Sequence, residues 1–455
     1  METLLHTLQV INNYMKERDI CGELLYRGEK SHLLRVANDQ VSLNVTEEGG
    51  KFFVTLQDNK RFARGSIATS AENITHIKGL IDDLHESIRF FPEVPFSTPM
   101  KPICQHTPYT AHCDPEIENM ESSIMRGLYE KAIEYYAPRG LTTSGSFSAG
   151  MYEYALINTL VEMPLYYKGT DFNTEVVLQL MEGKKEVRID SCGARLSQND
   201  PDRLLKDLER SVHCMVSTEC TEIKPGKYDV IFGINAIAEL ISFLSWLGFD
   251  GETYEYEMGM LQKSIHKMGD RILGENFTLI DDPEDPDILY AHPFGINGVE
   301  RKGIRIFDKG RICYLYYSDK LSADRFGHAV NNDISTANLK LLGGEGPASF
   351  NEMVSHCAAQ TIYIPYLHYM HSPNRAAGEI TATTRFGTFL LEDGKVKKHF
   401  INFRLHDTLF NIFSNIEWLS STLSAVNLAD TYDLRFAKSL TAPLYMRVKG
   451  VSLSN

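Results

Sequence analysis

Six prolines lie between Pro92 and Pro115, and this stretch constrains the fold more than any other part of the chain. Proline fixes φ and removes a backbone donor, so such a segment forms neither a regular helix nor a central strand. A chain of 455 residues is also expected to divide into domains, because a single core rarely grows beyond about 250–300 residues. Lys224-Pro225-Gly226 marks a second boundary. We predict an N-terminal α+β domain over 1–90, a linker over 91–115, a middle α+β region over 116–221 and a C-terminal domain over 222–455.

Hydrophobic periodicity predicts helices and strands in separate segments. Helices are expected over 2–18, 235–247 and 406–423, and from Asn199-Asp200-Pro201 onward. Short apolar runs predict strands over 21–67, 142–195 and 273–405, with Gly49-Gly50 as a hairpin turn. The predicted class is α+β, with an N-terminal helix-plus-antiparallel-sheet region and a strand-rich C-terminal domain with few helices.

Net charge and the arrangement of the cysteines indicate which partners the protein can bind and in which cellular compartment it lies. The formal net charge is −14, and an acidic surface repels the phosphate backbone of nucleic acids. The most apolar stretch, Ile237 to Phe249, is far shorter than the ~20 residues that cross a bilayer. The N-terminus lacks the features of a signal peptide, and the eight cysteines are scattered without any Cys-x-x-Cys. We expect a cytoplasmic protein that binds neither nucleic acid nor membrane.

The local patterns that hold a hydrolytic metal ion in a single chain are missing. No His-Glu-x-x-His occurs, and the closest histidine pair, His368 and His371, has no acid between its members. The acidic run from Asp281 to Asp287 contains two prolines that break the spacing of a calcium loop, so a solvated loop is expected there. No cofactor is predicted.

Several stretches, taken in order, resemble the TldD/PmbA family over nearly the whole chain and most clearly over 222–450. They are Lys224-Pro225-Gly226-Lys227-Tyr228-Asp229-Val230-Ile231-Phe232, Phe277-Thr278-Leu279-Ile280-Asp281-Asp282-Pro283, Asn338-Leu339 followed by Gly343-Gly344, the run from Thr384-Arg385-Phe386-Gly387 to Glu392-Asp393-Gly394-Lys395, and Asn402-Phe403-Arg404. Their order and spacing together make the resemblance specific.

The resemblance implies two kinds of subunit. The peptidase subunit carries His-Glu-x-x-x-His on the helix after the Tyr228 strand and a cysteine ligand near its C-terminus, whereas the TldE or PmbA kind lacks both. Here Ala238 and Phe243 stand at the histidine positions, Glu239 is retained, and the last cysteine is Cys357. The family's Phe-Asp-x-Glu-Gly is replaced by Phe294-Gly295-Ile296-Asn297-Gly298, in which both carboxylates are missing.

The implied role is the non-catalytic partner of a metal-bearing TldD-type subunit, in an oligomeric assembly that cleaves unfolded or flexible peptides. A homodimer is a further expectation. Whether the chain has activity of its own stays open. One alternative is a self-contained metallopeptidase with ligands such as His356, His368 and His371, and the other is a regulator that binds DNA gyrase. We predict a peptide or partner surface formed by Tyr363, Tyr366, His368, Tyr369, His371 and Arg385.

Overall fold

The computed structural model describes residues 1–180, 185–428 and 434–454. Within these residues the strands form three sheets, and the helices lie beside them, which confirms the predicted α+β class. In the same part of the chain, no helix combines the length and the apolar character needed to cross a bilayer.

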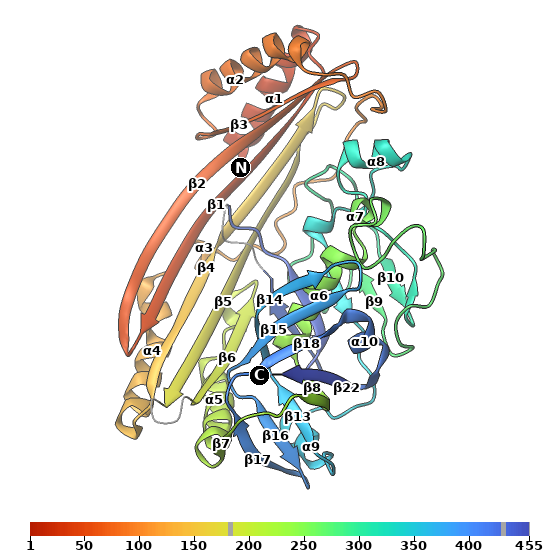
Figure 1. Ribbon diagram of the computed structural model, residues 1–455. Helices are drawn as coiled ribbons and strands as arrows, with labels where there is room; N and C mark the ends of the chain where they lie inside the picture. Colours follow the sequence, from red (N-terminus) through yellow and green to blue (C-terminus); the bar gives the residue numbers. More distant parts are fainter. Residues whose placement is uncertain (181–184, 429–433, 455) are drawn as a thin grey trace.

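A long, curved, antiparallel sheet runs along one side of the molecule in the order β3-β2-β1-β4-β5-β6 (Figure 1). Its strands are β1 (Gly22–Ala37), β2 (Gln40–Asp58), β3 (Arg61–Ala68), β4 (Thr142–Asn158), β5 (Leu165–Leu180) and β6 (Lys185–Gly193). Since β1 pairs with both β2 and β4, the regions on the two sides of the proline-rich stretch share this sheet. The prolines therefore do not divide the sheet.

Helices cover the two ends of this sheet. They are α1 (Glu2–Glu17), α2 (Ile74–Ser87), α3 (Pro115–Glu118), α4 (Ser122–Tyr136) and α5 (Pro201–Val216), with 3-10 turns η1 (Ile88–Phe90), η2 (Ala137–Arg139) and η3 (Leu196–Gln198). Figure 1 shows α1 and α2 at one end and α4 and α5 at the other. Each end has its own apolar core, one built around Leu8 and Ile81 and the other around Leu128 and Leu208.

The turn between β1 and β2 lies at Asn38-Asp39, so the predicted turn at Gly49-Gly50 is wrong. Asn38 and Asp39 have φ of 51° and 63°, the left-handed values that a two-residue hairpin requires. Gly50 lies within β2 opposite Gly28. A Cβ on Gly50 would lie 2.3 Å from the hydroxyl of Tyr26, and one on Gly28 would lie 2.6 Å from it. Both glycines therefore make room for a buried ring.

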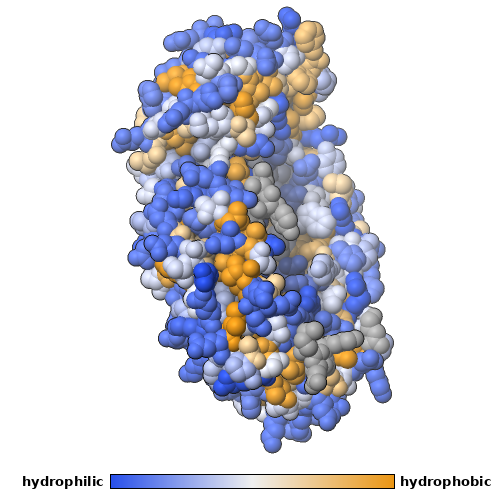
Figure 2. Space-filling view, turned by 90° about the vertical axis from the view of Figure 1, so that its left-hand side faces the viewer, coloured by the Kyte–Doolittle hydropathy of each residue, from blue (hydrophilic) through white to orange (hydrophobic). Residues whose placement is uncertain are grey.

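The outer part of β2 is open. β3 pairs with β2 only from Lys51 to Asp58, so residues 40–50 have β1 as their single strand neighbour in the described chain. Val41 and Leu43 of this segment are exposed. Figure 2 looks onto this side and shows hydrophobic side chains in a broken stripe along it.

The C-terminal half contains the other two sheets. One has the order β11-β10-β9-β12-β21-β20, and the other has the order β14-β15-β18-β22-β8-β13-β16-β17-β7, with β19 beside β22. The strands are β7 (Glu219–Thr221), β8 (Gly226–Gly233), β9 (Leu279–Asp281), β10 (Ile304–Asp308), β11 (Arg311–Ile312), β12 (Leu339–Leu341), β13 (Thr361–Ile364), β14 (Tyr366–Asn374), β15 (Glu379–Arg385), β16 (Phe389–Glu392), β17 (Lys395–Phe400), β18 (Arg404–Thr408), β19 (Ile416–Leu419), β20 (Leu423–Asn427), β21 (Ser439–Pro443) and β22 (Tyr445–Ser454). The helices are α6 (Ile234–Gly248), α7 (Gly251–Glu255), α8 (Lys320–Phe326), α9 (Phe350–Ser355) and α10 (Leu409–Ser414), with the 3-10 turn η4 (Ile334–Thr336).

The central helix of this half is α6, as predicted, and its residues Leu240 and Leu244 are fully buried in the largest apolar core. The expected helix over 406–423 is wrong except for α10. Asn415 ends that helix, and Ile416 onward pairs with β22 because the apolar residues of this run complete a sheet.

The two halves share a core. Tyr290, Phe294 and Phe436 of the C-terminal half pack into the apolar cluster of the long sheet, together with Tyr152 and Tyr154. The buried guanidinium of Arg435 also forms an ion pair with Asp171 of β5, with Nη2 2.7 Å from Oδ2. The long sheet and the C-terminal half are therefore joined by apolar packing and by a buried charge pair.

Candidate functional site

A cavity of about 250 Å³ lies where β6 and α5 meet the C-terminal half. The first residues of α6, the connection from β13 to β14, and strands β20 and β22 complete its walls. The predicted surface residues Tyr363 and Tyr366 both line it. Segments that lie far apart in the sequence thus line one open cavity.

Arg188 of β6 is the central charge of this cavity. Its Nη2 lies 2.6 Å from Oε2 of Glu175, and its Nε donates to Oδ1 of Asp190 at 2.7 Å. The guanidinium lies over the rings of Tyr366 and Phe386, at 5.2 Å and 5.6 Å from their centroids. Burial opposes the charge of Arg188, but Asp190 and Glu175 outweigh it and raise the pKa above its usual value. The two carboxylates thus hold the arginine in place.

The hydroxyl of Tyr366 completes the cluster by donating a hydrogen bond to Asp190, and it also lies 3.2 Å from the backbone oxygen of Arg188. Burial, and then the charge of Asp190, raises the pKa of Tyr366 well above its usual value, so the phenol stays neutral. Cys192 also lines the cavity, where burial raises its pKa to about 12. A thiol held protonated in this way is a poor nucleophile.

Arg385 of β15 fixes the C-terminal sheet against β6. Its Nε and Nη2 donate to the two carboxylate oxygens of Glu186 at 2.8 Å and 2.7 Å, a bidentate geometry. Burial raises the pKa of Glu186, but the hydrogen bonds and charge of Arg385 outweigh it and lower the pKa overall. Arg385 therefore lies beside the cavity as a positioning residue.

The other predicted surface residues lie outside the cavity. His368 is partly buried against the edge of the Phe386 ring, with the ring centroids 5.1 Å apart. Tyr369 is 81% exposed at a φ of 51°, and His371 is exposed. All three belong to β14, which ends the strand order of its sheet and has irregular pairing between His368 and His371. The structure thus brings two tyrosines together in the cavity and places the remaining β14 residues on the neighbouring edge.

The helix that carries the family's ligand positions begins at this cavity. Asn235 lines the cavity, and Glu239 follows one turn later on the same face of α6. Glu239 is partly buried, and burial raises its pKa. Ala238 is buried, whereas Phe243 is partly buried with its ring edge-on to the exposed Trp246. A methyl group and a phenyl ring have no donor atom for a metal ion.

Metal-ligating side chains do not gather elsewhere in the described residues. Across 1–180, 185–428 and 434–454, no three His, Cys, Asp or Glu side chains lie together in a way that could hold an ion. His356, at the end of α9, makes a 2.7 Å contact with the backbone oxygen of Glu352, while His368 and His371 lie on β14.

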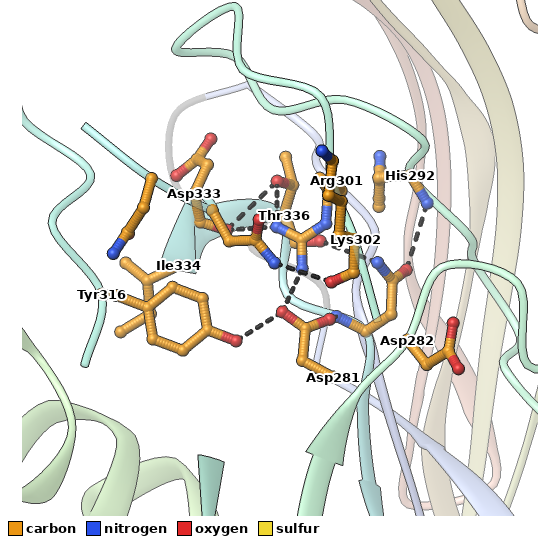
Figure 3. Close-up of polar contacts among 12 residues, drawn as sticks. Asp281, Asp282, His292, Arg301, Lys302, Tyr316, Asp333, Ile334 and Thr336 are labelled. Atoms are coloured by element: carbon orange, nitrogen blue, oxygen red, sulfur yellow. Dashed lines mark hydrogen bonds and ion pairs between the residues drawn. The ribbon is translucent and has the colours of Figure 1, made fainter. Parts of the chain in front are cut away.

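A second polar cluster, drawn in Figure 3, has a buried ion pair at its centre. The side chains of Asp281 and Arg301 are both fully buried and form an ion pair, and Tyr316 donates to the same carboxylate. Arg301 also donates to Thr336 Oγ1 at 2.8 Å. The expectation of a solvated loop is therefore wrong for Asp281, which holds together three connecting segments of the C-terminal half.

The same cluster reaches residues 294–298, the segment without carboxylates. Asp333 lies against this segment, and a Cβ on Gly295 would lie 2.5 Å from the Cβ of Asp333. Asp333 Oδ2 accepts a 3.0 Å hydrogen bond from the backbone of Ile296. Asp333 therefore occupies the space that a side chain at position 295 would need.

Sequence reasoning missed the charged residues of the cavity, although β6 contained a signal for them. Glu186, Arg188 and Asp190 alternate along that strand, so they share one face and carry opposite charges. Such a row indicates ion pairs across a packed surface, but the partners Glu175 and Arg385 come from other strands.

Comparisons with known proteins agree on the fold. Residues 225–455 match the PmbA/TldA metallopeptidase C-terminal domain. TldE from Thermococcus kodakarensis superposes with a TM-score of 0.81 and 16% identity, over 99% of this chain and 100% of that one. Two proteins described as proposed modulators of DNA gyrase also match. The one from Bacteroides thetaiotaomicron has a TM-score of 0.78 and 16% identity over 99% and 98% of the two chains, and the one from Thermotoga maritima has 0.77 and 14% over 99% and 99%. No curated protein matches the sequence.

Proposed function

The chain belongs to the PmbA/TldD family, and from this premise we propose that it is the non-catalytic partner of a metal-bearing, TldD-type subunit in a peptidase assembly. The assembly acts on unfolded or flexible peptides in the cytoplasm. The metal-bearing subunit supplies the chemistry, and this chain supplies part of the surface that receives the peptide.

The observation that supports the proposal is which residues occupy two positions of α6. The family scaffold is kept along the whole chain, with 99% of it superposing on a solved TldE. The two positions that the resemblance assigns to histidine ligands nevertheless hold Ala238 and Phe243. A catalytic zinc site uses three protein ligands and an open position for water. Since these residues do not fit a metal ion, no reaction step is assigned to this chain.

The retained carboxylate does not replace the lost ligands. Glu239 is partly buried, and its pKa is raised by burial alone, without a cation among the causes. A lone carboxylate neither polarises a carbonyl nor lowers the pKa of a bound water as a metal ion does. Glu239 therefore fits a surface that faces the substrate space better than it fits a catalytic centre.

The edge strand β14 is the surface that we assign to the peptide. Its outer side has no neighbouring strand within the described residues, so its backbone groups can pair with an extended peptide. The cavity beside it contains two tyrosines, and two of its arginines, Arg188 and Arg210, are paired with carboxylates. Such a surface suits backbone hydrogen bonds and aromatic contacts rather than one charged side chain. This favours peptides of varied sequence.

The test compares cleavage of a flexible peptide by this protein, by a metal-bearing family partner and by an equimolar mixture. We expect no cleavage by this protein alone and chelator-sensitive cleavage by the mixture, at a rate above that of the partner. Ala238→His/Phe243→His should stay inactive alone, because the third ligand and the groups that orient it are missing. Cleavage by this protein alone, at a purity that excludes the partner, contradicts the proposal.

A second part of the assay locates the peptide surface. In the mixture, Tyr369→Ala should raise KM several-fold while leaving subunit association unchanged, because this exposed side chain lies on the β14 edge. Tyr256→Ala is the matched control, since Tyr256 is also exposed but packs on Phe326 and Arg325. Equal KM values for the two variants would exclude β14 as the peptide surface.

A further inference from the structure

A second cavity, of about 270 Å³, lies on the other side of the molecule from α5, near α8. Its floor is formed by β1, β2 and β3 of the long sheet. The proline-rich residues 98–103 form one wall, and two segments of the C-terminal half, 297–299 and 318–330, form the others. The cavity is therefore built by both halves of the chain.

A row of polar residues crosses the floor of this cavity. Glu23 of β1 lies opposite Thr55 of β2 and opposite Asn158 of β4, and Thr55 in turn lies opposite Arg64 of β3. Residues directly opposite one another in antiparallel strands share a face of the sheet. Glu23, Thr55 and Arg64 line the cavity, whereas the amide of Asn158 donates to the backbone oxygen of Lys101 at 2.8 Å.

Glu23 is the acidic member of this row. It is partly buried, and within the described residues its carboxylate receives no hydrogen bond and forms no ion pair. Burial raises its pKa to about 7, and the charge of Arg64 opposes that shift only in part. A desolvated carboxylate without a partner is costly, so a cation that reached it would be bound favourably.

The other charged residues around the cavity already have counter-ions or lie in solvent. Arg64 lies 3.6 Å from Asp319, and Lys320 pairs with Asp324. Lys101 is exposed. The remaining side chains of the walls are largely apolar and include Phe62, Met100, Pro102, Ile103, Val299 and Val330.

We propose that this cavity binds a primary ammonium group carried on an apolar body, with the Glu23 carboxylate as its counter-ion. The apolar walls accept the body, and the unpaired acid on the floor fixes the ammonium. A free aliphatic or aromatic amine has this chemistry, and so does the amino-terminus of a peptide that begins with an apolar residue. The proposal is independent of the proposed function, because neither β14 nor the metal-bearing partner enters it.

Binding is coupled to a proton. In the empty cavity Glu23 is partly protonated near pH 7, whereas beside an ammonium group the charged form is favoured. A carboxylic acid therefore loses its proton to the buffer as the cation binds. The ammonium of an alkyl amine stays protonated over this range, since such groups titrate near ~10, whereas a peptide amino-terminus titrates near ~8 and is therefore compared at pH 7. Affinity should rise with pH from 6 to 8, which the wild-type protein alone can show.

The experiment is calorimetric titration of the full chain with benzylamine. We expect saturable binding that tightens several-fold between pH 6 and pH 8 and releases protons in buffers of different ionisation enthalpy. Benzyl alcohol, which lacks the charge, and Glu23→Gln should each bind at least ten-fold more weakly. Glu130→Gln, which changes an exposed glutamate of α4, is the control and should bind like the wild type.

Two further measurements keep the outcome unambiguous. Glu23→Gln should not melt below the wild type at pH 8, because it removes a desolvated charge. Phe-Gly-Gly and acetyl-Phe-Gly-Gly distinguish the sources, since only the first should compete with benzylamine if the site accepts a peptide terminus. Absence of saturable binding, affinity that does not change with pH, or equal affinity for the alcohol would each overturn the proposal. These results leave the cleavage assay of the mixed subunits unaffected.

Discussion

Phe243 shows how one residue can hold a ligand position without performing its chemistry. Its ring packs on the core beneath α6 and meets the exposed Trp246 edge-on, so it lies between the core and the surface. Phe243 and Trp246 lie off the side of α6 that buries Leu240 and Leu244, and this second side is partly open. An aromatic pair at such a border is a feature of surfaces that a partner covers.

The partial burial of Phe243 sets the cost of removing it. Phe243→Ala should lower the free energy of unfolding by ~1.5–2.5 kcal/mol, about half the ~3–5 kcal/mol of a fully buried ring. Leu244→Ala, at a fully buried neighbour, should cost ~2–5 kcal/mol. Urea unfolding followed by circular dichroism measures both. A larger loss for Phe243→Ala than for Leu244→Ala would show that the ring lies deeper in the core.

At the scale of the element, the hairpin of β1 and β2 shows what sequence patterns do not predict. Alternation in the sequence correctly predicts strands before and after Gly49-Gly50, yet the glycines lie within one continuous strand. The reason is a contact between strands: the Tyr26 ring needs the space beside Gly28 and Gly50. Such a contact depends on the register of the strand pairing, which local sequence patterns do not determine.

The two adjacent glycines of β2 allow a matched test. Gly50→Ala should destabilise the protein by ~1–3 kcal/mol, because the new methyl group would overlap the buried Tyr26 ring. Gly49→Ala meets nothing within 4 Å and should be neutral or stabilising by up to ~1 kcal/mol, since alanine loses less conformational freedom. Thermal melts of both variants provide the measurement. Equal midpoints would mean that the ring moves aside without cost.

The residues of the candidate site also fall into two groups, those that local sequence patterns predict and those that they do not. Tyr363, Tyr366 and α6 could be found from the sequence, because aromatic runs and helical spacing are local patterns. The pairing of Arg188 with Glu175 could not, because it depends on the register of β5 with β6. The pairing of Arg385 with Glu186 could not either, because it joins two sheets. The fold class needed only periodicity, whereas the cavity needed the tertiary arrangement.

At the scale of the whole molecule, the shared core predicts cooperative unfolding. Both tryptophans, Trp246 and Trp418, lie in the C-terminal half, whereas much of the strand signal comes from the long sheet. Because Phe436 and Arg435 are buried against that sheet, the two halves should unfold together. Tryptophan fluorescence and far-ultraviolet circular dichroism should give the same urea midpoint. Separate midpoints would show that each half is stable alone.

The position of β8 has a consequence for biosynthesis. This apolar strand lies between β13 and β22, and β22 follows it by about 200 residues. At ~5–20 residues per second, a ribosome needs roughly 10–40 s to make that interval. During this time β8 has left the exit tunnel but cannot yet pair with β22. Chaperones can bind it as a nascent segment. An inner strand of the sheet is thus translated about 200 residues before the neighbour that encloses it.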